Sequence, residues 1–232
     1  MSVVMRLEKV TLEYPVPRQY RKEDVKPSGV RHISLDVLQG EVLGIIGRNG
    51  SGKSTLLKMM AGVFPPDSGT IATAGSVSLL AGVGVGFHRD LTGRENAYLY
   101  GALMGRTNKE IDELIDEIKS FAELEHHFDR PIRTYSSGMK SRLGISVATS
   151  FKPDLLLIDE VLGVGDASFR KKSEERVKQL INDSGTVVIV SHSMGLLSSI
   201  CTRIVLLNDG EFVTIGKPED VLSKYKELLK LN

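Results

Sequence analysis

Apolar residues follow two spacings along the chain, and both predict β-strands. Alternating apolar positions predict strands over residues 5–14 and 33–37, and another strand follows the Gln39-Gly40 turn over residues 41–46. Continuous apolar runs are typical of strands buried on both faces. They cover residues 155–158, 187–190 and 204–207. Because helical patterns separate these runs, the sequence predicts an α/β fold with a mostly parallel core sheet.

The middle of the chain predicts a helical subdomain over about residues 92–150. Thr92 with Glu95, and Thr107 with Glu110, have capping-box spacing, in which hydroxyl and carboxyl satisfy free backbone amides. Apolar residues then recur on one face of the second helix. The two helices therefore begin with the same device.

Two other segments stand apart from this pattern. Residues 70–87 predict an antiparallel β-rich patch of short strands joined by glycine turns. Residues 15–30 form a long polar connection that holds three prolines, and a flexible surface loop is its plain interpretation. We expect the whole chain, residues 1–232, to form one domain.

Composition restricts the classes of function. Thirty Lys and Arg against twenty-nine Asp and Glu leave a net charge of +1, so we expect no nucleic-acid partner bound by bulk charge. The single cysteine, Cys201, fits a reducing compartment. No stretch is apolar enough to predict a membrane span, and no signal-peptide core is present. The sequence therefore predicts a cytosolic chain, unless a partner holds it at a membrane.

The first chemical motif follows the strand over residues 41–46. It has the spacing G-x-x-x-x-G-K-S, lies between a predicted strand and a helix, and is a phosphate loop. Its glycines let backbone amides point at phosphate oxygens, and the helix dipole adds positive potential. We expect Lys53 to reach the terminal phosphates and Ser54 to ligate Mg²⁺. The residues expected to bind ATP here are Gly47, Arg48, Asn49, Gly50, Ser51, Gly52, Lys53, Ser54 and Thr55.

Acidic and histidine residues end two of the buried strands. Asp159 follows the run over 155–158 and suits a Mg²⁺ site, and Glu160 is placed to activate water as general base. His192 follows the next run and is expected to contact the γ-phosphate; a structural core histidine is the alternative. Carboxyl ends of parallel strands are where such sites lie.

Ser136, Ser137 and Gly138 precede a predicted helix over residues 140–148, which makes a further anion site at a helix N-terminus. With the phosphate loop and the acidic strand end, this Y-S-S-G-M motif resembles the L-S-G-G-Q signature of the ATP-binding cassette (ABC) ATPases. Ser136 and Gly138 match phosphate-contacting positions, whereas Ser137 and Met139 depart from the common form. The resemblance implies a head-to-tail homodimer that encloses two ATP. It also implies that Tyr14 stacks on adenine.

These departures and several other segments are similar to those of the polysaccharide-exporter branch of that family. They include G-F-H at 86–88, L-T-G-R-E-N at 91–96 and D-E-V-L-G-V-G-D-A at 159–167. The resemblance implies an ATPase that exports lipid-linked O-antigen, capsule or teichoic-acid polymers. It also implies a polytopic membrane permease as partner and a peripheral position at the cytoplasmic face of the membrane. The basic residues of the 15–30 loop are then expected near lipid or a lipid-linked phosphate.

His88 stands where most relatives have Gln. Imidazole and amide have similar reach and both donate hydrogen bonds. We therefore expect His88 to bind near the nucleotide and Mg²⁺ and to link that site to the permease. The alternative is a polar loop residue without such a role.

Two rival functions stay open at this point. One is a soluble ABC protein that acts on ribosomes or DNA, which usually has two cassettes or a long coiled coil. The other is a nucleotide switch that binds ATP without hydrolysis, which the Asp159-Glu160 pair disfavours. Co-purification with a membrane protein and a turnover assay separate these rivals from the exporter.

Overall fold

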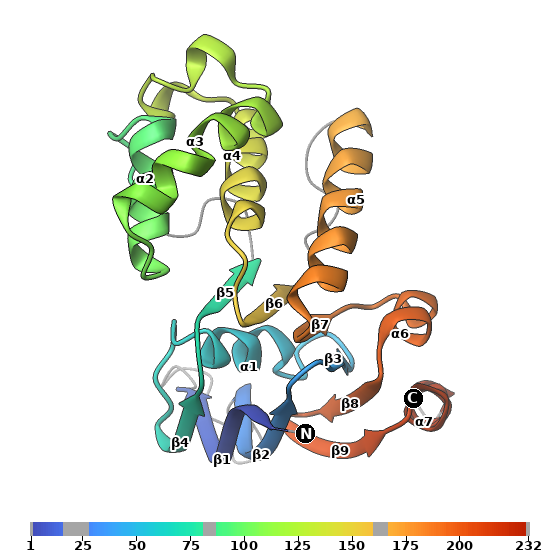
Figure 1. Cartoon of the computed structure of the whole chain (residues 1–232). Helices are drawn as coiled ribbons and strands as arrows, with labels where there is room; N and C mark the ends of the chain where they lie inside the picture. The colour runs from blue at the N-terminus through green and yellow to red at the C-terminus, as the bar shows by residue number, and fades with distance from the viewer. Residues whose placement is uncertain (1, 16–27, 81–86, 160–166, 231–232) are drawn as a thin grey trace. The chain divides into compact units, whose positions relative to one another are not determined.

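A computed structural model of the chain describes residues 2–15, 28–80, 87–159 and 167–230 (Figure 1). Most of the predicted 15–30 loop, residues 81–86 of the predicted β-rich patch, and the predicted general base Glu160 lie outside these residues. The chain divides into two compact units. The first comprises Met1–Gly75, Leu157–Asp159 and Gly185–Asn232, and the second comprises Ser76–Leu156 and Glu160–Ser184.

The first unit contains an antiparallel sheet at the N-terminus. Its strand order is β2-β1-β4, with β1 at Val3–Tyr14, β2 at Ser28–Leu38 and β4 at Ser68–Thr73. Inward-facing apolar residues of β1 and β2, such as Leu7 and Ile33, are almost fully buried. This sheet confirms that the fold has an antiparallel part beside its parallel core.

The core sheet has the strand order β5-β6-β7-β3-β8-β9. Its strands are β3 (Val42–Ile46), β5 (Val77–Leu80), β6 (Leu155–Asp159), β7 (Val187–Val190), β8 (Arg203–Asn208) and β9 (Glu211–Gly216). β3 runs parallel to β7 and to β8, and β9 is antiparallel to β8. The register pairs Ile45 with Val190 and Ile46 with Leu206, so β3, β7 and β8 end at the same edge.

The helices of the first unit are α1 (Lys53–Met60), α6 (Met194–Ile200) and α7 (Pro218–Lys230). Leu56, Leu57 and Met59 of α1 are buried, which confirms an apolar helix directly after the phosphate loop. Within the described residues, no helix of either unit is long and apolar enough to cross a membrane.

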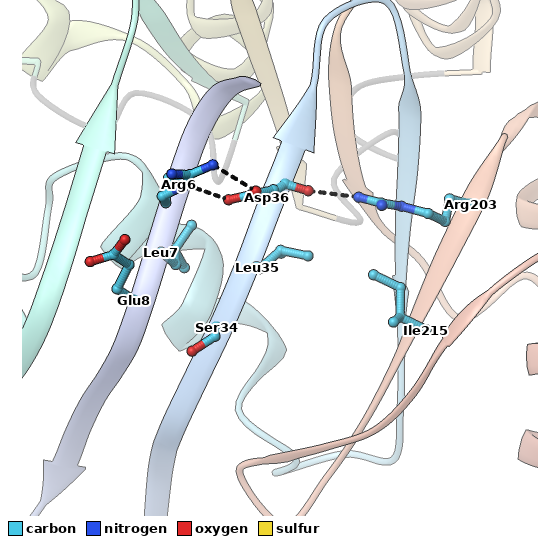
Figure 2. A pocket seen from close by; sticks show the side chains of 8 residues that line it. All are labelled: Arg6, Leu7, Glu8, Ser34, Leu35, Asp36, Arg203 and Ile215. Carbon is cyan, nitrogen blue, oxygen red and sulfur yellow. Dashed lines mark hydrogen bonds and ion pairs between the residues drawn. The ribbon is translucent and has the colours of Figure 1, made fainter. Parts of the chain in front are cut away.

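A charge network joins β2 to β8 within the first unit (Figure 2). Arg6 donates from Nε and Nη2 to the Asp36 carboxylate at 2.9 and 3.0 Å. Arg203 donates to the Asp36 carbonyl at 2.6 Å and to Glu41 Oε1 at 3.1 Å. Burial raises the pKa of Glu41, and the hydrogen bond from Arg6 lowers the pKa of Asp36. The hollow of about 410 Å³ beside this network is therefore lined by arginines that already have partners, and we assign it a structural role.

The second unit is mainly helical. Its helices are α2 (Gly93–Leu103), α3 (Asn108–Ala122), α4 (Ser137–Ser150) and α5 (Ala167–Ser184). Phe128, Phe151 and Leu143 form part of one buried cluster with the inner faces of α2, α3 and α4. Both predicted capping boxes are present, at Thr92 and at Thr107.

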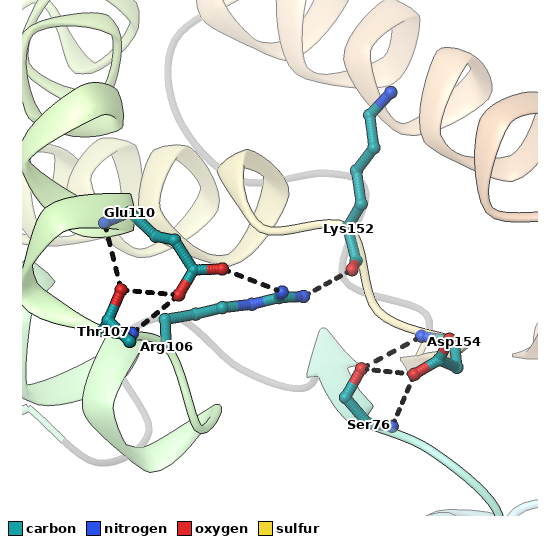
Figure 3. A network of polar contacts seen from close by, with 6 residues as sticks. All are labelled: Ser76, Arg106, Thr107, Glu110, Lys152 and Asp154. Carbon is teal, nitrogen blue, oxygen red and sulfur yellow. Dashed lines mark hydrogen bonds and ion pairs between the residues drawn. The ribbon is translucent and has the colours of Figure 1, made fainter.

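Polar contacts fix the connections of this unit (Figure 3). Arg106, between α2 and α3, pairs with Glu110 at 3.6 Å and donates to the Lys152 carbonyl at 2.7 Å. The Asp154 carboxylate accepts from the amide and the hydroxyl of Ser76 at 2.7 and 2.8 Å. The first contact ties the α2–α3 turn to the end of α4, and the second ties the start of β5 to the start of β6.

The predicted patch over residues 70–87 differs from the structure in one respect. Its two strands belong to different sheets, because β4 pairs with β1 whereas β5 lies beside β6. Gly75, with φ of 91°, lies in the short link between them. Local spacing predicts strands but carries no information about the partner of each strand.

Candidate nucleotide-binding site

The phosphate loop connects β3 to α1 and depends on two glycines. A Cβ on Gly47 would lie 2.1 Å from the Leu207 carbonyl oxygen and 2.6 Å from Ser51 Oγ, so no larger residue fits. Gly52 has φ of 96° and is the residue before α1, where the left-handed conformation favours glycine. The loop is therefore shaped by the backbone and by its contact with β8.

The N-terminus of α1 faces into this loop. The first hydrogen bond along the helix runs from the Leu56 amide to the Gly52 carbonyl at 2.9 Å. The first amides of a helix have no acceptor within it, and the helix dipole places positive potential there. This end of α1 is suited to bind phosphate oxygens.

Polar groups inside the loop fit a phosphate ligand. Lys53 is only 6% exposed, and its Nζ donates to the carbonyls of Gly47 and Arg48 at 2.8 Å each. Ser51 is 2% exposed, and among the described residues its Oγ has no hydrogen-bond partner. A buried hydroxyl without a partner is costly, and a phosphate oxygen is a suitable acceptor for it. Arg48, Asn49 and Gly50 form the exposed tip of the loop.

The two residues of the first unit predicted to ligate Mg²⁺ both have side-chain oxygen atoms. Ser54 is exposed in the first turn of α1, and Asp159 is half-buried as the last residue of β6. Hydroxyl and carboxylate oxygens are the ligands that Mg²⁺ prefers in proteins. Both residues belong to the first unit, as does the phosphate loop.

Tyr14 lies beside the first turn of α1. It ends β1, is 40% exposed, and its hydroxyl accepts from Thr55 Oγ1 at 3.4 Å. Its ring also meets Phe64 edge-on, with centroids 6.5 Å apart. The structure thus places an exposed aromatic ring next to the phosphate loop, as an adenine-stacking residue requires.

His192 follows β7 at the edge where β3 also ends. It is exposed and lies between Ser191 and Ser193, and the Ser193 amide donates to Ser191 Oγ at 3.1 Å. Ser193 in turn caps α6 through the Leu196 amide. The register of β3 with β7 therefore places His192 and the start of the phosphate loop at neighbouring strand ends.

The remaining predicted residues belong to the second unit. Ser136 is the N-cap of α4, and its Oγ accepts from the Met139 amide at 3.2 Å. Ser136 and Ser137 are exposed, and a Cβ on Gly138 would meet only Ser136 Oγ, at 3.8 Å. Within the described residues this helix start is open, and its amides are accessible to an incoming ligand.

His88 is exposed, and its backbone is held firmly. Its amide donates to Asn96 Oδ1 at 2.7 Å, and Asn96 Nδ2 donates back to the His88 carbonyl at 3.1 Å. The Asp90 amide donates to His88 Nδ1 at 3.4 Å. A ring that accepts at Nδ1 has its proton at Nε2 when neutral.

Comparison with known proteins decides the family. Residues 30–163 match the family described as "ABC transporter", which is more than half of the chain. The chain belongs to the ABC transporter family. An O-antigen export system ATP-binding protein, RfbB of Myxococcus xanthus, is 43% identical over 88% of this chain and 47% of the relative. The teichoic acids export ATP-binding protein TagH of Levilactobacillus brevis is 39% identical over 99% of this chain and 66% of the relative.

Solved structures agree with the ABC fold. A dimeric structure of a post-hydrolysis state of the ATP-binding cassette MJ0796, bound to ADP and Pi, matches 92% of this chain and 98% of that one. The TM-score is 0.72 at 24% sequence identity. The predicted α/β fold and the resemblance to the polysaccharide-exporter branch are therefore confirmed. This chain spans about half to two thirds of the length of the two relatives.

Two residues of the quoted motifs have positioning roles that the sequence analysis did not predict. Tyr135 is 5% exposed and donates from its hydroxyl to the His127 carbonyl at 2.6 Å, which fixes the start of the signature motif. Burial raises the pKa of Tyr135 to about 12. Asn96 is fully buried, and besides its bonds to His88 it donates to the carbonyls of Leu91 and Thr92. A buried asparagine in an apolar helix face was the available signal.

Proposed function

We propose that this chain is the ATP-hydrolysing subunit of an ABC transporter that exports a lipid-linked polysaccharide. The observation that carries the proposal is the phosphate loop, with the buried Lys53 ammonium and the N-terminus of α1 at one place. The names of the O-antigen and teichoic-acid export relatives support the class of cargo. We place the subunit at the cytoplasmic face of the membrane, bound to a polytopic permease.

The residues that serve a protomer's own nucleotide have separate roles in this proposal. The amides of the loop and Lys53 bind the β- and γ-phosphates, and Tyr14 stacks on the adenine ring. Ser54 and Asp159 hold Mg²⁺, which when bound neutralises charge on the phosphate oxygens. Glu160 accepts a proton from the attacking water, and His192 donates to the γ-phosphate.

The signature motif of the second unit serves the nucleotide of another protomer. Two protomers associate head to tail, and Ser136 with Gly138 of one protomer completes the phosphate site of the other. The dimeric state named for the MJ0796 structure supports this arrangement. The exposure of Ser136 and the free space at Gly138 also support it, because a second surface can approach them.

His88 links the nucleotide site to the permease. Its backbone is clamped by Asn96, which leaves the imidazole as the part that responds to the ligand. We expect His88→Gln to keep polymer export and His88→Ala to lose export while ATP binding persists. Full export by the alanine variant contradicts the link.

Replacement of the proposed base tests the function most simply. Glu160→Gln keeps the shape of the side chain and removes its basicity, so turnover falls by about 10²–10⁴-fold. ATP binding persists, and the variant elutes as a dimer in ATP during size-exclusion chromatography. Hydrolysis at the wild-type rate contradicts the assignment of Glu160. Co-purification of the wild-type chain with a polytopic membrane protein, rather than with ribosomes or DNA, tests the transport role.

A further inference from the structure

One carboxylate in the second unit joins three helices. Glu123, directly after α3, accepts from Arg142 Nη1 of α4 at 3.2 Å and from Lys172 Nζ of α5 at 2.8 Å. Lys172 Nζ also donates to the Phe121 carbonyl at 3.1 Å, which caps the C-terminal end of α3. The side chains of Glu123, Arg142 and Lys172 are 46%, 26% and 39% exposed.

Aromatic rings reinforce this junction. The ammonium of Lys172 lies 4.7 Å from the centroid of the Phe121 ring, and the Arg176 guanidinium lies 5.5 Å from it. Phe169 of α5 is 1% exposed and packs edge-on against Phe121, with ring centroids 5.7 Å apart. The Arg142 guanidinium lies over the Phe169 ring, 5.7 Å from its centroid. Cation–π contacts of this kind add to the ion pairs.

Local physics disfavours glutamate at position 123. Its φ of 55° and ψ of 41° are left-handed, a conformation that usually selects glycine or asparagine after a helix. A negative charge at a helix C-terminus also opposes the helix dipole. A residue that is locally unfavourable in two ways points to a requirement for its side chain.

The two helices whose side chains contact Glu123, α4 and α5, begin near different functional residues. Arg142 lies in α4, which begins at the signature residues Ser136–Gly138. Lys172 is the sixth residue of α5, which begins seven residues after Glu160. In the proposed dimer, α4 serves the partner's nucleotide, whereas Glu160 serves the nucleotide of its own protomer.

We propose that Glu123 is a positioning residue that couples the two ATP sites of the dimer, through Arg142 on the signature helix and Lys172 on the helix after Glu160. The proposal rests on the proposed function of Ser136, Gly138 and Glu160. A change at one site then reaches the other site through a fixed junction of α3, α4 and α5. The observable consequence is cooperative hydrolysis, with a Hill coefficient above one.

The chain offers a matched control for this junction. Glu117 also lies on α3 and pairs with Arg176 of α5, and the contacts described for it include none to α4. Its side chain is 47% exposed, close to the value for Glu123. Glu117→Gln therefore removes an equivalent charge from the same helix without touching the signature helix.

The experiment is an ATP titration of hydrolysis by the purified full chain with Mg²⁺. For Glu123→Gln we expect the Hill coefficient to fall to one and kcat to fall at least about fivefold, as coupling between sites allows. Half-saturating ATP stays within about twofold, because the phosphate loop is unchanged. Glu123→Asp keeps the charge and retains most of the rate, and Glu117→Gln matches the wild type in all three quantities.

Three results overturn the proposal: a wild-type Hill coefficient of one, equal effects of Glu123→Gln and Glu117→Gln, or equal loss in Glu123→Asp and Glu123→Gln. Partial unfolding does not imitate the expected result, since it lowers the rate per mole but leaves the Hill coefficient of the folded dimers unchanged. Glu160→Gln in the same assay reports on the proposed function separately. If that variant hydrolyses ATP normally, the role of Glu160 is wrong, whatever Glu123→Gln does.

Discussion

The two units present their anion-binding helix ends in opposite states. In the first unit, the base of the loop before α1 is enclosed: Gly47 and Ser51 are buried, and Lys53 already contacts the carbonyls of Gly47 and Arg48. In the second unit, Ser136 and Gly138 at the start of α4 are accessible, with free space around them. One helix end is shaped by its own chain, and the other is suited to a surface that arrives from elsewhere.

This difference follows from what each motif contacts. Gly47 lies against the backbone of β8, so its environment is fixed by the core sheet. Gly138 lies in the first turn of α4, where an added Cβ would meet only Ser136 Oγ, at 3.8 Å. Substitutions in the two motifs should therefore have different effects on ATP binding, on the stability of the fold and on contact with the partner protomer.

The largest expected effect is on ATP affinity in Lys53→Ala. Hydrogen bonds from a charged donor contribute roughly 1.5–3 kcal/mol each, so loss of the ammonium weakens ATP binding by about 100-fold or more. We expect the chain to stay folded, because the Lys53 ammonium donates to carbonyls of the phosphate loop rather than packing in the apolar core. Calorimetric titration measures the affinity, with Lys109→Ala, at an exposed position of α3, as the control that binds ATP normally. Unchanged affinity in Lys53→Ala contradicts the phosphate-loop assignment.

A pair of alanine substitutions compares the two glycines directly. Gly47→Ala puts a Cβ 2.1 Å from the Leu207 carbonyl oxygen and should destabilise the chain by about 2–3 kcal/mol. Gly138→Ala meets no close neighbour and should be neutral or stabilise by up to about 1 kcal/mol, since alanine favours helix. Urea unfolding measures both. Similar losses in the two variants remove the distinction between an enclosed and an open motif.

A smaller effect is expected at Tyr135, which holds the signature motif to the preceding turn. Tyr135→Phe removes the hydrogen bond to the His127 carbonyl and should cost about 1–2 kcal/mol. Burial raises the pKa of Tyr135 from 10.0 to about 12, so its neutral form stabilises the fold fully below pH 10. That stability is lost as the pH rises from 10 toward 12.

Unfolding measured across this alkaline range tests the assignment. The wild type should lose more stability between pH 10 and 12 than Tyr135→Phe does, because the variant has no phenol to ionise. Cys201, whose pKa burial also raises to about 12, is present in both proteins and cancels in the difference. Tyr14→Phe, at an exposed position, should behave like the wild type. Equal alkaline losses in wild type and Tyr135→Phe show that this phenol is not buried as described.

The sequence predicted features that depend on local geometry. The phosphate loop, both capping boxes and the strand ends at Asp159 and His192 all follow from spacings within a few residues. The clamp by Asn96 did not emerge, because the motif shows the residue but not that its side chain turns back to His88, eight positions earlier. The junction at Glu123 did not emerge, because Glu123 meets residues 19 and 49 positions away. The separation of β4 from β5 was missed for the same reason, since strand partners are decided by packing across the chain.

The central claim is that the open motif of one protomer completes the enclosed motif of another. Lys53→Ala disables the phosphate loop, and Gly138→Asp places a carboxylate where the partner's γ-phosphate should bind. Asp is favourable in the first turn of a helix and meets free space at this position, so the second variant should fold.

A mixture of the two inactive variants tests this claim most directly. In a mixed head-to-tail dimer, both changes fall in one ATP site and leave the other site intact. Equal amounts of Lys53→Ala and Gly138→Asp should therefore recover hydrolysis, up to about a quarter of the wild-type rate, from random pairing of protomers. Hydrolysis no greater than the sum of the separate variants contradicts the claim, because it means that each protomer uses its own signature motif or acts alone.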